Sequence, residues 1–216
     1  PRLKEQAMHF RLAVVPEINY LSTLVADAFK HYALYQQTIG QTFTKKADYQ
    51  RFIQQLHAVH VAVNVHLKKA FVVEEQQQIV SVVILDSPQL PTASIWQYLK
   101  YGGLKLLPYV LTHQLGRFLQ MLDDAEKVPQ QDQQVNWHVN LLAVNPAHQG
   151  QQIGSKTLTQ FVLPYVKKHG GQQVSLITNT ARNVAFYQKN AFQVIGERLL
   201  AFQTTQVKSW ALVRQV

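Results

Sequence analysis

Asn140-Leu-Leu-Ala-Val-Asn-Pro-Ala-His-Gln-Gly-Gln-Gln-Ile-Gly-Ser-Lys-Thr-Leu158 joins an apolar run to a glycine-bearing loop and the start of a helix. The run 141–144 predicts a buried strand, which Asn145-Pro146 ends. The first N–H groups of a helix have no partner within the helix, and the helix dipole attracts negative charge there. The stretch therefore predicts an anion site, and a phosphate-bearing ligand is the first to suspect.

The composition is that of a globular chain. Of 216 residues, 47% are hydrophobic and 15% are charged, so we expect one domain, 1–216, with a helical insertion at about 93–130. The absence of cysteine excludes disulfides, thiolate catalysis and Cys-based zinc sites. The first residues lack the apolar segment of a signal peptide, and every apolar stretch is shorter than the roughly 18 residues of a membrane span. We expect a cytoplasmic protein without membrane contact.

The formal net charge of +9 leaves three interpretations open. Paired lysines occur at 45–46, 68–69 and 167–168, but they form no long basic run. A solvated surface or an anionic cofactor explains such a charge, whereas nucleic-acid binding would rest on the charge alone. Nucleic acid is therefore the least favoured partner.

Apolar periodicity predicts an α+β chain in the order β-α-α-β-β-(helical insert)-β-α-β-α-β-β. Gly170-Gly171 is typical of a helix C-cap, and Pro164 should kink the helix before it. A polar linker is expected at 130–134. The expected strands are 10–15, 71–74, 79–85, 135–144, 174–178, 192–196 and 199–213, and the expected helices are 17–32, 45–69, two or three short ones within 95–127, 151–169 and 181–190.

Two motifs in this order resemble the GCN5-related N-acetyltransferase (GNAT) superfamily. Its phosphate-loop pattern, Gln/Arg-x-x-Gly-x-Gly/Ala, is similar to Gln149-Gly-Gln-Gln-Ile-Gly154, with Gln152 in place of the first glycine. Its Asn…Tyr-x-x-x-Gly-Phe segment is similar to Asn183…Tyr187-Gln-Lys-Asn-Ala191-Phe, with alanine in place of glycine. The helical insert is similar to that of the puromycin N-acetyltransferase-like members. The resemblance implies a three-layer fold with a central twisted mixed sheet flanked by helices.

The resemblance also implies acetyl-CoA as donor and an amine on a small molecule or peptide as acceptor. The pyrophosphate would bind the loop N–H groups, and the pantetheine would pair with the edge of the central strand. One of the Asn179, Thr180 and Asn183 side chains would contact the pantetheine. No metal is expected, because the histidines lack ligand spacing with carboxylates. The cofactor-binding residues so implied are Leu142, Ala143, Val144, Gln149, Gly150, Gln151, Gln152, Ile153, Gly154, Ser155, Asn179, Thr180 and Asn183.

Direct attack by an amine requires a base for the amine and an acid for the leaving thiolate. Tyr187 matches the thiolate acid of the family, although a core tyrosine is the alternative. For the base we expect His138 on the central strand, which would share a face with Asn140, Leu142 and Val144 if no bulge intervenes. A water chain would serve instead if His138 is only a core or surface side chain.

Other features are left open by the sequence. His148 is expected to face solvent or phosphate, and Glu74 and Glu75 are alternative carboxylates for amine recognition. Regions 31–50 and 93–134 should form the acceptor wall. A backbone N–H of the central strand would hold the tetrahedral oxyanion. A non-catalytic CoA-binding or sensor module on the same fold is the competing interpretation, and either a monomer or a homodimer is compatible with the residues.

Overall fold

The computed structural model describes residues 8–130 and 137–216, and seven strands of this part form one mixed sheet. The strand order is β1-β2-β3-β4-β5-β7-β6, and only the β4–β5 pair is parallel. This confirms the expected fold class. The strands are β1 His9–Leu12, β2 Ala70–Glu75, β3 Gln78–Asp86, β4 Trp137–Val144, β5 Gln173–Thr178, β6 Gln193–Phe202 and β7 Thr205–Gln215.

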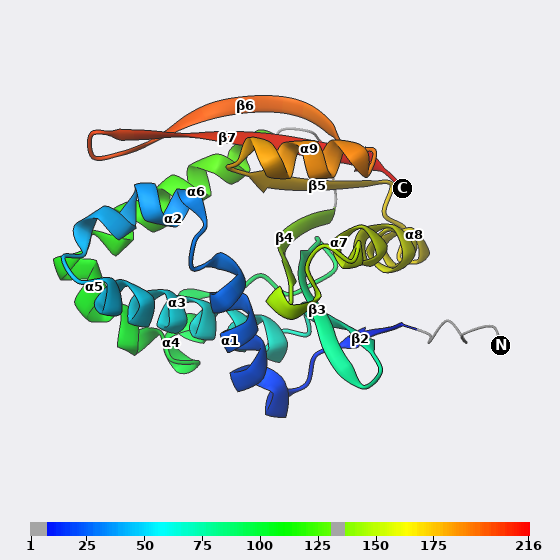
Figure 1. Cartoon of the computed structure of the whole chain (residues 1–216), viewed down its shortest axis with the longest axis horizontal. Coiled ribbons are helices and arrows are strands. Elements are labelled where there is room, and N and C mark those ends of the chain that lie inside the picture. The colour runs from blue at the N-terminus through cyan, green and yellow to red at the C-terminus, as the bar shows by residue number, and fades with distance from the viewer. Residues whose placement is uncertain (1–7, 131–136) are drawn as a thin grey trace.

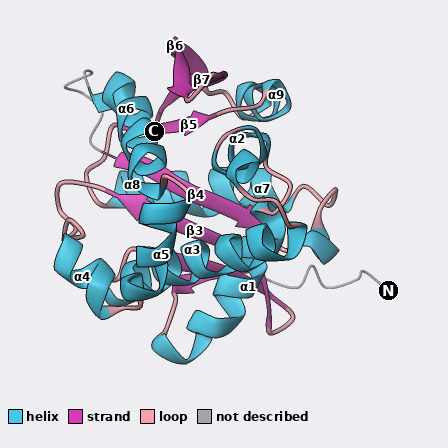
Figure 2. Cartoon of the chain, turned by 90° about the vertical axis from the view of Figure 1, so that its left-hand side faces the viewer, coloured by secondary structure: helices cyan, strands magenta, loops and turns pink. Residues whose placement is uncertain are grey.

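Helices cover both faces of the sheet (Figures 1 and 2). Apolar residues of α1 and α3 pack on one face of β2, β3 and β4, and the segment from α7 to α8 packs on the other. None of the described helices is long and apolar enough to cross a bilayer. The α-helices are α1 Ile18–Phe29, α2 Ala33–Gln37, α3 Lys46–His66, α4 Ile95–Lys100, α5 Leu107–Thr112, α6 Leu115–Gln130, α7 Ile153–Lys156, α8 Leu163–Lys168 and α9 Ala181–Lys189.

The helical insert between β3 and β4 divides as its glycines and proline predict. Helix α4 is followed by a 3₁₀ turn, Gly103–Leu106, and then by α5, which has Pro108 in its first turn. Gly102 has φ +112°, which separates α4 from the turn. The linker expected at 130–134 and the first two residues of the predicted strand 135–144 fall outside the described residues, except Gln130, which ends α6.

A β-bulge in β4 changes which side chains share a face. Ile84 pairs with Leu141 and Leu85 with Val139, so Asn140 is an extra residue opposite β3. Trp137 and Val139 pack with α8, whereas Leu141 packs with α1 and α3. The shared face expected for His138, Asn140, Leu142 and Val144 is therefore wrong. His138 and Asn140 lie on the α3 side, and Leu142 and Val144 lie on the side of α7 and α8.

The helical segment after β4 is irregular before its proline. Residues Thr157–Val162 form a π-helix between α7 and α8. Pro164 lacks the N–H for an i→i−4 bond and its ring crowds the carbonyl of that turn, so a widened turn precedes it. The predicted C-cap is confirmed, because Gly170 has φ +77° and the Gly171 N–H donates to Val166 O at 2.9 Å.

Glutamine occupies many tight turns of this chain. Seven non-glycine residues of the described part have positive φ, and five of them are Gln76, Gln77, Gln114, Gln152 and Gln203. The Gln76-Gln77 pair makes the expected β2–β3 hairpin. The final hairpin turns at Gln203, so the predicted strand boundary near 196–199 is wrong. Gly196 instead lies at a register shift within β6.

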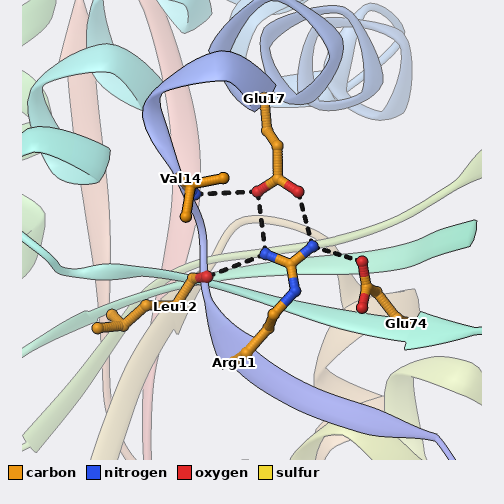
Figure 3. A network of polar contacts seen from close by, with 5 residues as sticks. All are labelled: Arg11, Leu12, Val14, Glu17 and Glu74. Atoms are coloured by element: carbon orange, nitrogen blue, oxygen red, sulfur yellow. Dashed lines mark hydrogen bonds and ion pairs between the residues drawn. The ribbon is translucent and has the colours of Figure 1, made fainter. Parts of the chain in front are cut away.

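Arg11 ties β1 to β2 and to the beginning of α1 (Figure 3). Its guanidinium donates to both Glu17 carboxylate oxygens, at 3.1 and 2.6 Å, and to the Glu74 carboxylate. The Glu17 carboxylate also accepts from Val14 N at 2.9 Å. Glu74 is thus held by this network, which explains its position without amine recognition.

Candidate functional site

The site lies where β4 and β5 part. The parallel pairing joins only Trp137–Val139 to Val174–Leu176, and beyond it the two strands diverge (Figure 1). The Asn145 N–H donates to Val80 O on β3 at 2.9 Å. Since strand N–H groups alternate in direction, those of Leu142 and Val144 point into the opening between β4 and β5. The Ala143 carbonyl instead accepts from Ser81 Oγ on the β3 side at 3.0 Å.

The loop after β4 leaves a row of N–H groups free at the end of this opening. The first backbone bond of the helical segment runs from Lys156 N to Gln152 O at 3.0 Å, so the N–H groups of Ile153, Gly154 and Ser155 have no helical acceptor. The Ile153 side chain anchors the loop against Val73 and Val80. These groups fit the pyrophosphate of a CoA-type ligand, and the strand edge fits its amide-bearing arm.

Both residues that replace a glycine of the family pattern keep a left-handed backbone. Gln152 has φ +60° and Ala191 has φ +61°. This strain costs about 1 kcal/mol per residue. Gly154 is needed for another reason, since a Cβ there would lie 3.1 Å from the Phe186 ring. The loop geometry of a glycine pattern is thus retained with glutamine in it.

Tyr187 of α9 lies on the α8 side of the sheet, packed against Phe186 and Phe192 with ring centroids 5.0 and 5.6 Å away. Burial raises the pKa of its hydroxyl well above the ordinary value, and Tyr32 adds a smaller effect in the same direction. Within the described residues the hydroxyl has no hydrogen-bond partner. It is therefore protonated at neutral pH and available to donate.

The three candidates for the pantetheine contact have different local roles. Thr180 caps α9, because its Oγ1 accepts from Asn183 N at 3.2 Å. Asn179 bonds Tyr32, donating from its N to the Tyr32 Oη at 2.9 Å, and it donates from its side chain to Lys208 O at 3.3 Å. Burial raises the pKa of the Tyr32 hydroxyl, and the Asn183 side chain, which lies beside it, partly opposes this shift. Among the described residues, the Asn183 side chain makes no hydrogen bond to the backbone, unlike those of Asn179 and Thr180.

A hydrogen bond joins Nδ1 of His138 to Ser175 Oγ at 2.8 Å. The Ser175 hydroxyl also reaches Trp137 O at 3.4 Å, and when it donates there its oxygen accepts from Nδ1 of His138. That tautomer has its proton on Nδ1 and a lone pair on Nε2. Nε2 is buried and has no partner among the described residues. Burial lowers the pKa of His138 to about 4, while Asp86 opposes this shift.

A second polar chain lies beside His138. His60 Nε2 donates to Asn140 Oδ1 at 2.9 Å, and Asn140 Nδ2 donates to Asp86 Oδ2 at 2.9 Å. The buried Lys69 ammonium forms an ion pair with the same carboxylate. The bulge residue Asn140 therefore links α3 to the end of β3. Among the residues described, no group of three or more His, Asp or Glu side chains could hold a metal ion.

These side chains line a cavity of about 570 Å³ on the α3 side of β4. The insert supplies part of its wall through Ala93, Tyr98, Asp123 and Glu126. Region 31–50 instead borders a separate pocket of about 520 Å³ near His113. Glu74 and Glu75 border neither pocket. His148 is half-buried, with Nδ1 buried and unpartnered among the described residues, so it does not simply face solvent.

Sequence reasoning missed Asp86, His60, Ser175 and Glu126. Asp86 offered a signal, because it directly follows the apolar run of β3 as an acidic strand end. The others come from α3, β5 and α6, and their meeting depends on the fold.

Comparison with known proteins shows which family model and which solved structures this chain resembles. Residues 116–194 match the family model described as "Acetyltransferase (GNAT) domain", which spans β4, the loop, β5 and α9. The match covers this part of the chain, and the family that it resembles is the GNAT superfamily. Nothing tests the puromycin N-acetyltransferase-like branch, which stays a prediction. No curated protein matches the chain.

Solved structures of low sequence identity share this GNAT fold. The C-terminal condensation domain of Ebony in complex with beta-alanyl-dopamine has a TM-score of 0.65 at 11% identity, covering 98% of this chain and 100% of that one. A Drosophila melanogaster polyamine N-acetyltransferase has a TM-score of 0.57 at 16% identity, covering 97% and 100%. The PaiA N-acetyltransferase of Thermoplasma acidophilum in complex with coenzyme A has a TM-score of 0.55 at 10% identity, covering 97% and 99%.

Proposed function

We propose that this protein transfers the acetyl group of acetyl-CoA to the amine of an acceptor. The observation that carries the proposal is the continuity of the free Leu142 and Val144 backbone edge with the free N–H groups of the loop. A strand edge next to a helix start fits a ligand with an amide-bearing arm and a pyrophosphate. Acetyl-CoA supplies the activated acetyl group as a thioester.

On this proposal, the protein binds the cofactor mainly through its backbone. The N–H groups of 150–155 hold the pyrophosphate, and the edge of Leu142 and Val144 pairs with the pantetheine amides. The side chain of Asn183 adds a further contact. The Leu142 N–H, which points into the opening, holds the thioester oxygen as negative charge develops on it. One such preorganised donor contributes about 3 kcal/mol.

Two side chains on opposite faces of the sheet move the protons. His138 Nε2 takes a proton from the attacking amine, since its lone pair is unpartnered and its Nδ1 is fixed by Ser175. Tyr187 Oη gives a proton to the departing thiolate, since burial keeps the hydroxyl protonated. On this proposal, the reacting bond lies in the opening beyond the paired part of β4 and β5, where it is reached from both faces.

The test combines calorimetry of acetyl-CoA binding with release of free CoA in the presence of a panel of amines. Tyr187→Phe should lower kcat about 100-fold, because the thiolate then leaves unprotonated, while the Kd for acetyl-CoA stays unchanged. A matched control is Tyr20→Phe on α1, whose ring is half exposed. A protein that neither binds acetyl-CoA nor releases CoA would overturn the proposal.

The same measurements separate the competing function, a non-catalytic CoA-binding module. Tight binding without turnover, or turnover unchanged in Tyr187→Phe, would favour that module. The positive φ of Gln152 and Ala191 weakens the argument for it, because these replacements leave the backbone in the conformation that glycine would adopt.

A further inference from the structure

The cavity beside His138 gathers acidic side chains in a chain that is strongly basic. The sequence has 12 acidic and 21 basic residues, yet among the described residues Asp86, Asp123 and Glu126 line this cavity and Lys69 is the one Lys or Arg that does. Lys69 and Asn140 already satisfy Asp86. Among the described residues, Asp123 and Glu126 have no ion-pair partner. The cavity therefore holds two carboxylates that a cation could neutralise.

An independent observation points to a ligand in the same cavity. Nε2 of His138 is buried and unpartnered among the described residues, and burying such an atom is unfavourable unless something pairs with it. His138 lies on β4, and the two carboxylates lie on α6 of the insert. The cavity therefore has a hydrogen-bond acceptor on one wall and negative charge on another.

We propose that this cavity is the acceptor site, and that the acceptor is a primary amine carrying a second cationic group. The inference rests on the proposed function. The reacting amine lies at His138 Nε2, and the second cation pairs with Glu126 and Asp123. Asp86 keeps its pairing with Lys69 and sets the position of Asn140. A neutral chain in place of the second cation leaves both carboxylates unpaired.

The surroundings of Glu126 make recognition depend on pH. Burial first, and then Asp86 and Asp123, raise the pKa of Glu126 to about 7, while Lys69 opposes them. Tyr98, His60 and His138 are the other titratable groups lining the cavity. A bound cation favours the ionised carboxylate, so ionisation of Glu126 and binding of the cation are linked. Preference for the dication should therefore increase as pH rises through 7.

The experiment compares 1,5-diaminopentane with hexylamine, which has the same length and one cation fewer, and with 6-aminohexanoate, which ends in an anion. The wild-type kcat/KM for the diamine should exceed that for hexylamine by about tenfold or more at pH 8, and the carboxylate should be the poorest acceptor. The ratio of diamine to hexylamine should decrease at pH 6. Taking the ratio removes the pH dependence that the two amines share, because each must lose a proton before it attacks.

Variants locate the effect. Glu126→Gln and Asp123→Asn should each lower kcat/KM for the diamine about tenfold and so lower the ratio of diamine to hexylamine, and Glu126→Gln should also abolish the pH dependence of that ratio. Asp48→Asn is the matched control. It removes a half-exposed charge on α3 that pairs with Arg51, 12 residues or roughly 18 Å along the helix from His60, the nearest cavity residue of that helix. Thermal melts check that each variant is folded.

The outcomes distinguish the two proposals. Equal activity on hexylamine, or acetylation of another class of amine with no effect of Glu126→Gln, would overturn the inference and leave the proposed function standing. Absence of acetyl-CoA binding and of CoA release would overturn both. If acetyl-CoA binds without turnover, calorimetry of 1,5-diaminopentane with the wild type and Glu126→Gln decides the inference. Binding lost in the variant supports it, and no binding refutes it.

Discussion

The two ends of β4 present different kinds of chemical group. At its beginning, His138 and Asn140 act through side chains that are bonded to β5, α3 and β3. At its end, Leu142 and Val144 present backbone N–H groups, and the following loop continues with more of them. The bulge at Asn140 separates the two ends.

On the proposed function, this difference lets one strand serve two ligands. The end that offers backbone groups depends on chain path, so any residue that can follow this path is tolerated, including Gln152 at positive φ. The end that offers side chains depends on residue identity and on partners from other elements. Substitutions at the two ends should therefore separate cofactor binding from acceptor chemistry.

The largest expected effect tests the backbone end. Gly154→Val would place a branched side chain where even a Cβ lies 3.1 Å from Phe186 and 3.5 Å from Val144. The beginning of the helical segment must shift from β4, so we expect acetyl-CoA affinity to decrease at least 100-fold, a change of about 3 kcal/mol. Calorimetry measures this. In Gly116→Val, at a site where a Cβ meets nothing within 4 Å, affinity should be unchanged.

An intermediate effect tests the side-chain end. His138→Gln removes the base and should lower kcat/KM about 100-fold with acetyl-CoA affinity unchanged. Steady-state kinetics and calorimetry on the same samples make the comparison. If the variant instead weakened acetyl-CoA binding with kcat intact, the separation between the two ends of β4 would be refuted.

The smallest effect concerns strain at the backbone end. Gln152→Gly should raise the free energy of unfolding by about 1 kcal/mol or less, because the left-handed strain is removed while unfolded-state entropy partly offsets the gain. Gln149→Gly is the control, since Gln149 has φ −65° and gains nothing from glycine. Chemical denaturation should show opposite signs for the two variants. Equal signs would mean that Gln152 is not strained.

The backbone end was the part of the site that sequence could predict. The apolar run, the proline and the two glycines of the loop are contiguous, so their meaning does not depend on distant contacts. The side-chain end could be predicted only as far as His138. Its cavity requires α3, the end of β3 and α6 to meet, and residues more than 20 positions apart carry no local sign of that meeting.

Helix and strand ends were predicted best where glycine, the usual residue of caps and turns, marks them. Gly170-Gly171 ended a helix as expected. The last hairpin turn was predicted just after Gly196, but it lies at Gln203. The shared face of β4 was wrong for a related reason, since a bulge leaves apolar alternation looking regular while it changes the side on which each residue lies.

The bulge at Asn140 fixes the number of residues that β4 can have between His138 and Leu142. Because successive side chains alternate, deleting or inserting one residue between His138 and Leu142 would move one of them to the wrong face, and restoring either would displace the other. The strand can therefore accept many substitutions along its length, but it cannot gain or lose a single residue in this interval. Chain length, more than composition, is the quantity that couples the acceptor side of this sheet to its cofactor side.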